Sequence, residues 1–305
     1  MGEFFKINIL MTNKDFVEKF GFEQCVLELL DSIEKDNKKI RDSIINKYLG
    51  ESLSATQEEE LMEYSINNSV FSAATVANPA TSVVTEFLYT RPNQPLFIDQ
   101  YFFKSKGGKA IYSRLSCVEE HLRQLIELYL QDGKVLIGSL GGGPSRDISD
   151  VFSKYYKDNK DVLAINIDRD RVASERGRRM AEKAGVSDKI NFLDSSFMRY
   201  KPKKKFNIIL LVGVLCGLTP EACVLVLKNA KKMLSKGGCI LTSNVTPKML
   251  EQDPFTYFIM KKITGWELIF KDEETLSYIF KKAGLKWRKS FTDEYGFHIM
   301  PIATH

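Results

Sequence analysis

Apolar positions recur along the chain with two different spacings, and the change divides it into two parts. From about Asn13 to Gly133 they lie three or four residues apart, which is the period of amphipathic helices. Asn78-Pro79 and Arg91-Pro92 interrupt this pattern and indicate loops. We therefore predict a mostly helical N-terminal part, whose last helix begins near Ile111 and ends at Gly133.

From Lys134 onward, short runs of Val, Ile and Leu alternate with helical segments. The apolar runs are 134–140, 161–168, 189–195, 206–214 and 239–245. Continuous apolar strands joined by helical crossovers are typical of a parallel sheet that is covered on both faces. After a helix at 272–285, two strand-like segments at 286–293 and 297–305 are joined by a short turn, which predicts an antiparallel final pair.

The predicted fold class is therefore α/β, a Rossmann-like seven-stranded sheet with an antiparallel last strand, preceded by an N-terminal helical cap. The expected division is a cap and substrate region at 1–120 and a ligand-binding domain at 121–305. A length of 305 residues allows one large domain with an accessory one.

Three consecutive glycines, Gly141, Gly142 and Gly143, lie where the first predicted strand meets the following helix. Glycines at such a joint let a ligand approach the backbone, and the N–H groups of the next helix point toward it. Pro144 suits the first turn of that helix because it has no N–H to lose. A dinucleotide fingerprint would need a glycine where Arg146 stands, so the match to that fingerprint is incomplete.

Three further strand ends carry groups suited to an adenosine-containing ligand. Asp168 ends the second strand, where a carboxylate can accept hydrogen bonds from both ribose hydroxyls. Asp194 ends the third strand and can accept a hydrogen bond from an adenine amine, and Gly213 leaves room at the end of the fourth. Because ligands of open α/β sheets bind at the carboxyl ends of the strands, we expect these groups to share one rim.

These motifs resemble those of the class I S-adenosylmethionine-dependent methyltransferases. The stretch "SLGGGPSRD" is similar to the glycine-rich first motif, with Ser139 where an acid is common and Ser145 where a third glycine is common. The stretches "INIDRD" and "FLDSS" resemble the second and third motifs, and "LSKGG" resembles the turn before the fifth strand. The antiparallel final pair is also similar to that family.

The resemblance implies an S-adenosylmethionine-dependent methyltransferase with S-adenosylmethionine as cofactor and S-adenosylhomocysteine as product. It implies that the motif residues bind this cofactor. They are Ser139, Gly141, Gly142, Gly143, Asp147, Asp168, Arg169, Asp194, Ser195, Val212 and Gly213.

A narrower resemblance lies downstream. The stretch "WELIFKDEE", Trp266–Glu274, is similar to the tail of bacterial methyltransferases that make methyl esters of hydroxy fatty acids. It implies a carboxylate acceptor, which needs no strong base because it is already ionised at neutral pH. Catalysis would then come mainly from positioning. We expect the methyl acceptor to be a small molecule that offers a carboxylate or a hydroxyl.

The segment before the first strand offers two candidate acceptor residues, Tyr112 and Arg114. Aromatic side chains can wall an apolar acceptor, and an arginine can hold a carboxylate bidentately. The residues after the fourth strand do not form an Asn-Pro-Pro-Tyr-like motif, which counts against methylation of base amino groups. We interpret Cys216, in an apolar run, as a packing residue.

Composition restricts the other possibilities. The net charge of +5 is mild, and "KPKKK" at 201–205 is typical of a solvated loop, so nucleic acid is an unfavoured partner. The five cysteines have no CxxC spacing, and with only three histidines we predict no metal site. No apolar run approaches the roughly 20 residues needed to span a bilayer, and the N-terminus does not read as a signal peptide. We expect a cytoplasmic protein, and a homodimer remains open.

Three other hypotheses stay open from the sequence. The same fold also carries out aminopropyl or aminocarboxypropyl transfer, which would call for an acidic acceptor pocket. An RNA or protein methyltransferase is favoured only by the mild basicity, and its binding would weaken with salt. A non-enzymatic binder would have no affinity for S-adenosylmethionine.

Overall fold

The computed structural model describes residues 55–78, 81–91, 96–258, 260–261 and 265–305. The predicted helices between Asn13 and Gly50 lie outside these residues. The helices are α4 (Ala55–Asn68), α5 (Val70–Ala77), α6 (Ser82–Thr90), α7 (Phe97–Lys104), α8 (Lys106–Leu130), α9 (Arg146–Tyr155), α10 (Arg171–Ala184), the 3-10 helix η1 (Leu215–Gly217), α11 (Pro220–Met233), α12 (Lys248–Gln252), α13 (Pro254–Phe258) and α14 (Glu273–Lys282). The strands are β1 (Val135–Leu140), β2 (Val162–Asp168), β3 (Ile190–Asp194), β4 (Phe206–Leu211), β5 (Leu234–Thr242), β6 (Asn244–Val245), β7 (Lys286–Thr292) and β8 (His298–Thr304).

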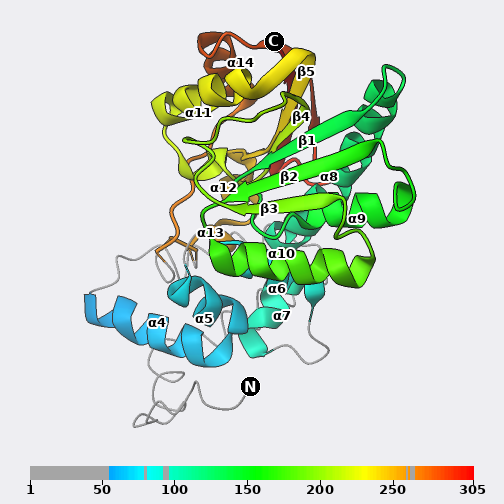
Figure 1. The fold of residues 1–305 in the computed structure, drawn as a ribbon. Helices are drawn as coiled ribbons and strands as arrows, with labels where there is room; N and C mark the ends of the chain where they lie inside the picture. The colour runs from blue at the N-terminus through cyan, green and yellow to red at the C-terminus, as the bar shows by residue number, and fades with distance from the viewer. Residues whose placement is uncertain (1–54, 79–80, 92–95, 259, 262–264) are drawn as a thin grey trace.

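The strands form one mixed sheet in the order β3-β2-β1-β4-β5-β8-β6, with β7 paired to β8 (Figure 1). Strands β1 to β5 are parallel, and β8 runs antiparallel to β5, β6 and β7. This confirms the predicted α/β fold with an antiparallel end. The order reverses direction at β1, so the carboxyl ends of β1 and its neighbours β2 and β4 flank the crevice in which open α/β sheets bind ligands.

An eighth strand appears because the predicted strand 239–245 is interrupted at Ser243. The pairs Cys239↔Thr304 and Asn244↔Ile299 keep one register along β8, so β5 and β6 follow the same edge. β5 also begins earlier than the predicted strand, at Leu234, within the stretch "LSKGG" that the sequence predicts as a turn. Its register with β4 shifts between Phe206 and Ile208, so Ser235–Gly238, which the sequence predicts as a turn, form an irregular part of β5 instead.

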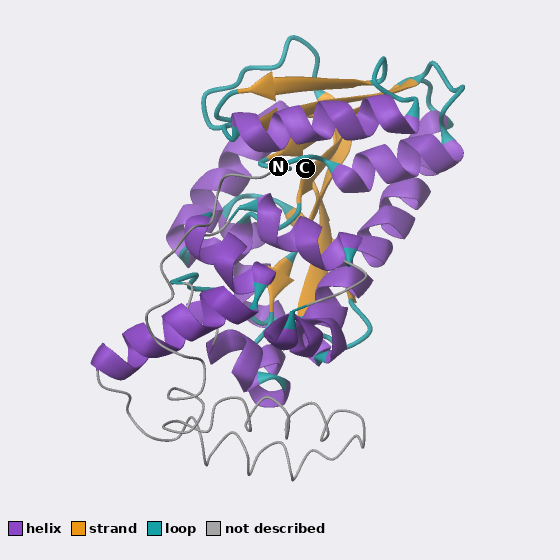
Figure 2. Ribbon diagram, turned by 90° about the horizontal axis from the view of Figure 1, so that it is seen from below, coloured by secondary structure: helices purple, strands orange, loops and turns teal. Residues whose placement is uncertain are grey.

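Two apolar layers hold the helices on the sheet. On one face, Val118 and Leu122 of α8 pack with residues of α9, β1 and β2. On the other face, Leu227 of α11 and Phe280 of α14 pack with β4 and β5. Figure 2 shows the strands between these helical layers. Both faces of the parallel strands are therefore dry, which explains their continuous apolar sequences.

Helices α4 to α7 lie on the side of the sheet that carries α10 (Figure 1). Helix α8 connects this region to the core. It starts at Lys106 rather than near Ile111 because the Ser105 side chain caps it, accepting from Gly108 N at 3.1 Å. The predicted domain division at residue 120 falls inside this helix. Among the described residues, no helix combines the length and the apolarity needed to cross a membrane.

Among the described strands β7 is an outer one, paired only with β8, and Lys286, Arg288 and Lys289 along it are exposed. The opposite end of the sheet is β3. Between the two ends, the strands that flank the ligand crevice have neighbours on both sides.

Gly177 lets α10 pack closely against Phe192 and against Pro144, the residue that follows the glycine joint. A Cβ there would lie 2.4 Å from Cε1 of the Phe192 ring and 2.6 Å from the Pro144 carbonyl oxygen. We expect Gly177→Ala to lower the free energy of unfolding by about 1–3 kcal/mol, although alanine favours helices, because the backbone of Pro144 has to move. Thermal unfolding followed by circular dichroism measures this.

Gly217→Ala is the matched control, because a Cβ at Gly217 meets nothing within 4 Å. An equal midpoint for the two variants would contradict the close packing described here.

Candidate functional site

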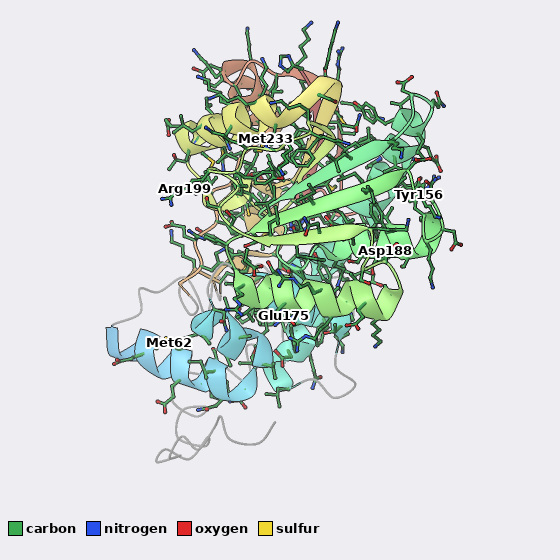
Figure 3. All side chains as sticks on the ribbon, in the orientation of Figure 1. Met62, Tyr156, Glu175, Asp188, Arg199 and Met233 are labelled. Atoms are coloured by element: carbon green, nitrogen blue, oxygen red, sulfur yellow. The ribbon has the colours of Figure 1, made fainter. Side chains whose placement is uncertain are left out.

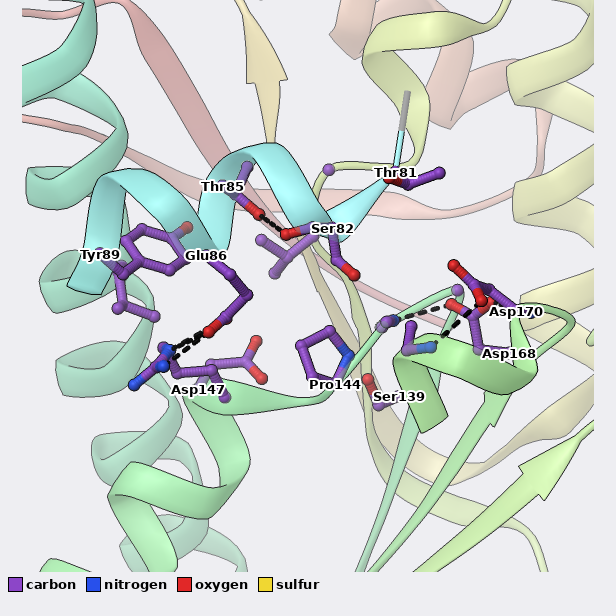
Figure 4. A pocket seen from close by; sticks show the side chains of 18 of the residues that line it. Thr81, Ser82, Thr85, Glu86, Tyr89, Ser139, Pro144, Asp147, Asp168 and Asp170 are labelled. Carbon is purple, nitrogen blue, oxygen red and sulfur yellow. Dashed lines mark hydrogen bonds and ion pairs between the residues drawn. The ribbon is translucent and has the colours of Figure 1, made fainter. Parts of the chain in front are cut away.

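A cavity of about 300 Å³ lies at the carboxyl ends of β1, β2 and β4, with α6 across from the glycine joint (Figure 4). Most of the predicted cofactor residues line it. They are Ser139, Gly141, Gly142, Gly143, Asp147, Asp168, Arg169, Val212 and Gly213. Arg114, predicted on the acceptor side, lines it too. The ends of β1, β2 and β4 therefore share one rim, whereas Asp194, at the end of β3, does not line the cavity.

The glycine joint is a tight turn whose geometry excludes side chains. Gly141 and Gly143 have φ of +67° and +55°, a region that favours glycine. A Cβ on Gly142 would lie 1.9 Å from Ser139 Oγ. Ser145, at the third glycine position of the resemblance, also has a left-handed φ of +55°, and such a conformation costs a non-glycine residue roughly 1–2 kcal/mol. The turn is thus held in shape at some cost in backbone energy.

The helix after this turn begins later than predicted. Pro144 does not stand in its first turn, because α9 starts at Arg146 and Ser145 precedes it without a side-chain cap. The left-handed Ser145 ends the loop, and Pro144 therefore belongs to the cavity wall.

The second strand fixes the glycine joint through Asp168 and Asn166. The Asp168 carboxylate accepts from Gly143 N at 2.7 Å and from Asp170 N at 2.8 Å. Asn166 Nδ2 donates to Gly143 O at 2.8 Å. A carboxylate has about four lone-pair sites, so Asp168 can still accept hydrogen bonds from a ligand.

Several buried polar atoms around the joint have no hydrogen-bond partner among the described residues. They include Asn166 Oδ1, Ser82 Oγ and Ser145 Oγ. Buried polar groups are usually paired, and an unpaired group costs about 1–3 kcal/mol. Of these three residues only Ser82 lines the cavity, so a polar ligand there could supply a partner for Ser82 Oγ.

Three predicted residues lie outside the lining of this cavity. The Asp194 carboxylate accepts from Arg178 Nη2 at 2.9 Å. Ser195 N donates to the Asp168 carbonyl at 2.8 Å. Tyr112 is 46% exposed, with the Arg91 guanidinium 5.0 Å from its ring centre. Their roles toward adenine and acceptor stay predictions.

Helix α6 supplies cavity residues that the sequence did not identify. Ser82, Thr85, Glu86 and Tyr89 all line the cavity from this helix (Figure 4). Glu86 is only 7% exposed and accepts from Arg146 Nη2 at 2.6 Å and Nε at 2.9 Å. This pair connects α6 to α9. The signal available in the sequence was Glu86 itself, a charged residue within an otherwise apolar helical segment.

Arg114 of α8 and Tyr89 of α6 meet at the cavity. Arg114 Nη2 donates to Tyr89 Oη at 2.8 Å. Burial raises the pKa of Tyr89 above its ordinary value, against the opposing effect of Arg114. The phenol therefore keeps its proton at neutral pH and can donate it to a further acceptor.

Acidic side chains gather where α8 meets α9. Burial raises the pKa of Asp147, which lines the cavity, to about 6. Burial, and then the nearby Asp150, raise the pKa of Glu119 to about 7. At neutral pH this region therefore carries less negative charge than its three carboxyl groups suggest.

The wall beyond Gly213 is formed by Cys216 and Trp266, and Lys271 holds it in place. Lys271 Nζ, buried at 2% exposure, donates to Leu215 O at 3.0 Å and to Ile269 O at 3.0 Å. Burial raises the pKa of the Cys216 thiol, so it is protonated at neutral pH and is no nucleophile. The segment Trp266–Glu274, singled out in the sequence, thus reaches the cavity through Trp266.

No family model matches the sequence, and no curated protein matches it. Several solved structures are similar to it. A possible exported protein from Bordetella parapertussis is 12% identical, with a TM-score of 0.69 over 96% of this chain and 98% of that one. A protein from Nostoc punctiforme PCC 73102, named for an expected O-methyltransferase activity, is 13% identical, with a TM-score of 0.54 over 97% and 99%.

A third structure is the magnesium protoporphyrin IX methyltransferase ChlM from Synechocystis PCC 6803, with bound S-adenosylhomocysteine. It is 12% identical, with a TM-score of 0.54 over 76% of this chain and 96% of that one. Identities this low show the fold alone. The chain has the fold of the class I S-adenosylmethionine-dependent methyltransferases, as its motifs predicted.

The raised pKa of Glu119 gives a testable pH dependence. The stability that its proton provides is complete below the ordinary pKa of 4.5 and is lost as pH rises toward about 7. We expect Glu119→Gln to be more stable than the wild type at pH 8, by about 1 kcal/mol after allowance for solvent screening. This corresponds to about 2 °C in the unfolding midpoint. The difference should vanish by pH 5.

Glu120→Gln is the control on the same helix. Hydrogen bonds from Arg123 lower the pKa of the exposed Glu120 to about 2, so its removal should bring no gain at pH 8. Parallel pH profiles for the wild type and Glu119→Gln would contradict the assigned burial.

Proposed function

We propose that this protein transfers the methyl group of S-adenosylmethionine to an oxygen atom of a small-molecule acceptor. The observation that carries the proposal is the bond between Gly143 N and the Asp168 carboxylate at the rim of the cavity. It brings the glycine joint of one strand against the acid of the next. This combination suits an adenosine whose ribose lies on the acid and whose tail crosses the bare backbone.

The residues at the rim fit this donor. Asp168 has free lone pairs for the two ribose hydroxyls, and Gly141–Gly143 leave the backbone N–H groups accessible. Ser82 Oγ, in the cavity lining, lacks a partner that a polar ligand can provide. When bound, S-adenosylmethionine supplies an electrophilic methyl group on a sulfonium centre.

The remaining work of the chain is positioning. Cys216 and Trp266 bound the cavity beyond Gly213, and we assign them to the acceptor side. An acceptor oxygen held there attacks the methyl carbon as the carbon–sulfur bond breaks, and the sulfur keeps the electron pair. A carboxylate acceptor arrives ionised, so none of the cavity residues has to act as a base. Exact placement and exclusion of water account for the rate.

The names of two similar structures are consistent with a small-molecule methyl acceptor, and one of them names oxygen. One is named for O-methyltransferase activity and another methylates a magnesium porphyrin. The resemblance of Trp266–Glu274 to enzymes that form methyl esters adds a carboxylate to the candidates, and Trp266 lies in the cavity wall. We therefore propose a carboxylate or hydroxyl on a small organic molecule as the methyl acceptor.

Calorimetric titration with S-adenosylhomocysteine tests the donor site. We expect the wild type to bind and Asp168→Ala to lose at least about tenfold in affinity, because hydrogen bonds to a carboxylate are worth about 1.5–3 kcal/mol. Asp168→Asn, which keeps one acceptor oxygen for Gly143 or Asp170, should lose less.

Asp188→Ala is the control. This exposed residue precedes β3, at the end of the sheet away from the rim (Figure 3). Absence of heat with the wild type, or equal affinities for the variants at 168 and 188, would refute the proposed donor site.

A further inference from the structure

Arg114 is a buried cation whose charge is not neutralised by any described residue. Its side chain lines the cavity, yet the residue is only 8% exposed. Nη2 donates to Tyr89 Oη, and Nε is buried without a hydrogen-bond partner. Within the described ranges, no carboxylate oxygen lies within 4 Å of an Arg114 guanidinium nitrogen, the limit for an ion pair. Asp147 is the acid whose field reaches it.

The other arginines of the cavity differ from it. Arg146 is neutralised by Glu86 through contacts of 2.6–3.1 Å. Arg169 is exposed and therefore hydrated. Arg114 alone among these three has lost its water without gaining an anion.

This arrangement is costly unless an anion completes it. Desolvation of a charged group costs several kcal/mol, and only a partner with good geometry offsets it. A guanidinium presents a fork of N–H groups that matches the two oxygens of a carboxylate. The protonated phenol of Tyr89 lies 2.8 Å from Nη2 and can donate to the same group.

The surroundings favour a singly charged anion. Asp147 lines the same cavity, and a dianionic phosphate would be repelled by its carboxylate at neutral pH. A carboxylate carries one charge, and an ammonium group on the same ligand would be attracted by Asp147. The charge of the surroundings and the shape of the guanidinium both favour a carboxylate ligand.

We propose that Arg114, assisted by the Tyr89 hydroxyl, is the carboxylate-binding residue of this cavity. Two ligands can bring that carboxylate: the amino-acid end of the methyl donor, or an acidic acceptor. The inference rests on the proposed function for the first source only, since the second can be probed without a nucleoside.

Three probes separate these sources in calorimetric titrations of the full chain. S-adenosylhomocysteine carries adenosine and an amino-acid carboxylate. 5′-Methylthioadenosine carries the adenosine but no carboxylate. Octanoate and benzoate, each compared with its primary amide, present a carboxylate without adenosine. The variants are Arg114→Gln, Arg114→Lys and Tyr89→Phe, with Arg123→Gln as control, a partly exposed arginine of the same helix that pairs with Glu120.

If the donor brings the carboxylate, Arg114→Gln should weaken S-adenosylhomocysteine binding about tenfold or more and leave 5′-methylthioadenosine unchanged. Arg114→Lys keeps the charge but not the fork of N–H groups, so its affinity for S-adenosylhomocysteine should lie between those of the wild type and Arg114→Gln. Tyr89→Phe should lose less affinity than Arg114→Gln. Unchanged binding of 5′-methylthioadenosine also shows that the variant is folded.

If an acceptor brings the carboxylate, both nucleosides should bind all variants equally. Octanoate or benzoate should then bind the wild type better than its amide does, and Arg114→Gln should abolish that preference. The inference is overturned if Arg114→Gln matches Arg123→Gln with every probe. It is also overturned if S-adenosylhomocysteine and 5′-methylthioadenosine weaken equally while circular dichroism and the unfolding midpoint are unchanged.

Failure of the proposed function gives a different result. A wild type that binds neither nucleoside refutes the donor site, and the carboxylate and amide pairs alone then decide the role of Arg114. In that case, equal or absent binding of each acid and its amide overturns the assignment of Arg114.

Discussion

The hydrogen bond from Gly143 N to Asp168 is the contact on which the arrangement of the site depends. It joins the end of one strand to the loop of its neighbour, so the glycine turn cannot relax into solvent. The left-handed backbone at Gly141, Gly143 and Ser145 persists because this bond and the one from Asn166 hold it. Strain that is fixed by neighbouring groups in this way is common where a backbone has to receive a ligand.

The helices around the rim close the site from the other side. Helix α8 packs Val118 and Leu122 into the core and extends Arg114 into the cavity from the same element. Helix α6 is attached to α9 through Glu86 and Arg146, and to α8 through Tyr89 and Arg114. Helices α6 and α8, which precede the first strand, therefore contribute residues to the lining of the candidate binding site.

The sequence was informative wherever a residue acts through the regular geometry of the sheet. Apolar runs predicted the parallel strands, and Asp168 and Gly143 could be assigned to one rim because strand ends meet there. The strand is interrupted at Ser243, whose side chain accepts a hydrogen bond from Gly213 N, and no periodicity reveals this break. The predicted start of α8 was too late because Gly107 and Gly108 suggested the end of a loop. In the structure, Ser105 caps a helix that contains both glycines.

The residues of α6 were missed for a different reason. Their place over the glycine joint results from packing between segments that are distant in the chain, and a single sequence carries no record of such pairs. Arg114 became a candidate because it stands in the segment directly before the first strand, but its lack of a counter-ion is a property of the folded chain. Asp194 is the opposite case: its position at a strand end suggested a ligand contact, but in the folded chain its carboxylate accepts a hydrogen bond from Arg178.

The basic side chains of β7 have a consequence for self-association. An outer strand with free N–H and C=O groups invites a second sheet to pair with it. Two copies joined there would bring Lys286, Arg288 and Lys289 of each against those of the other, and like charges would repel across the seam. Continuation of the sheet from one molecule to the next is therefore disfavoured at this end, and a dimer would need a different face.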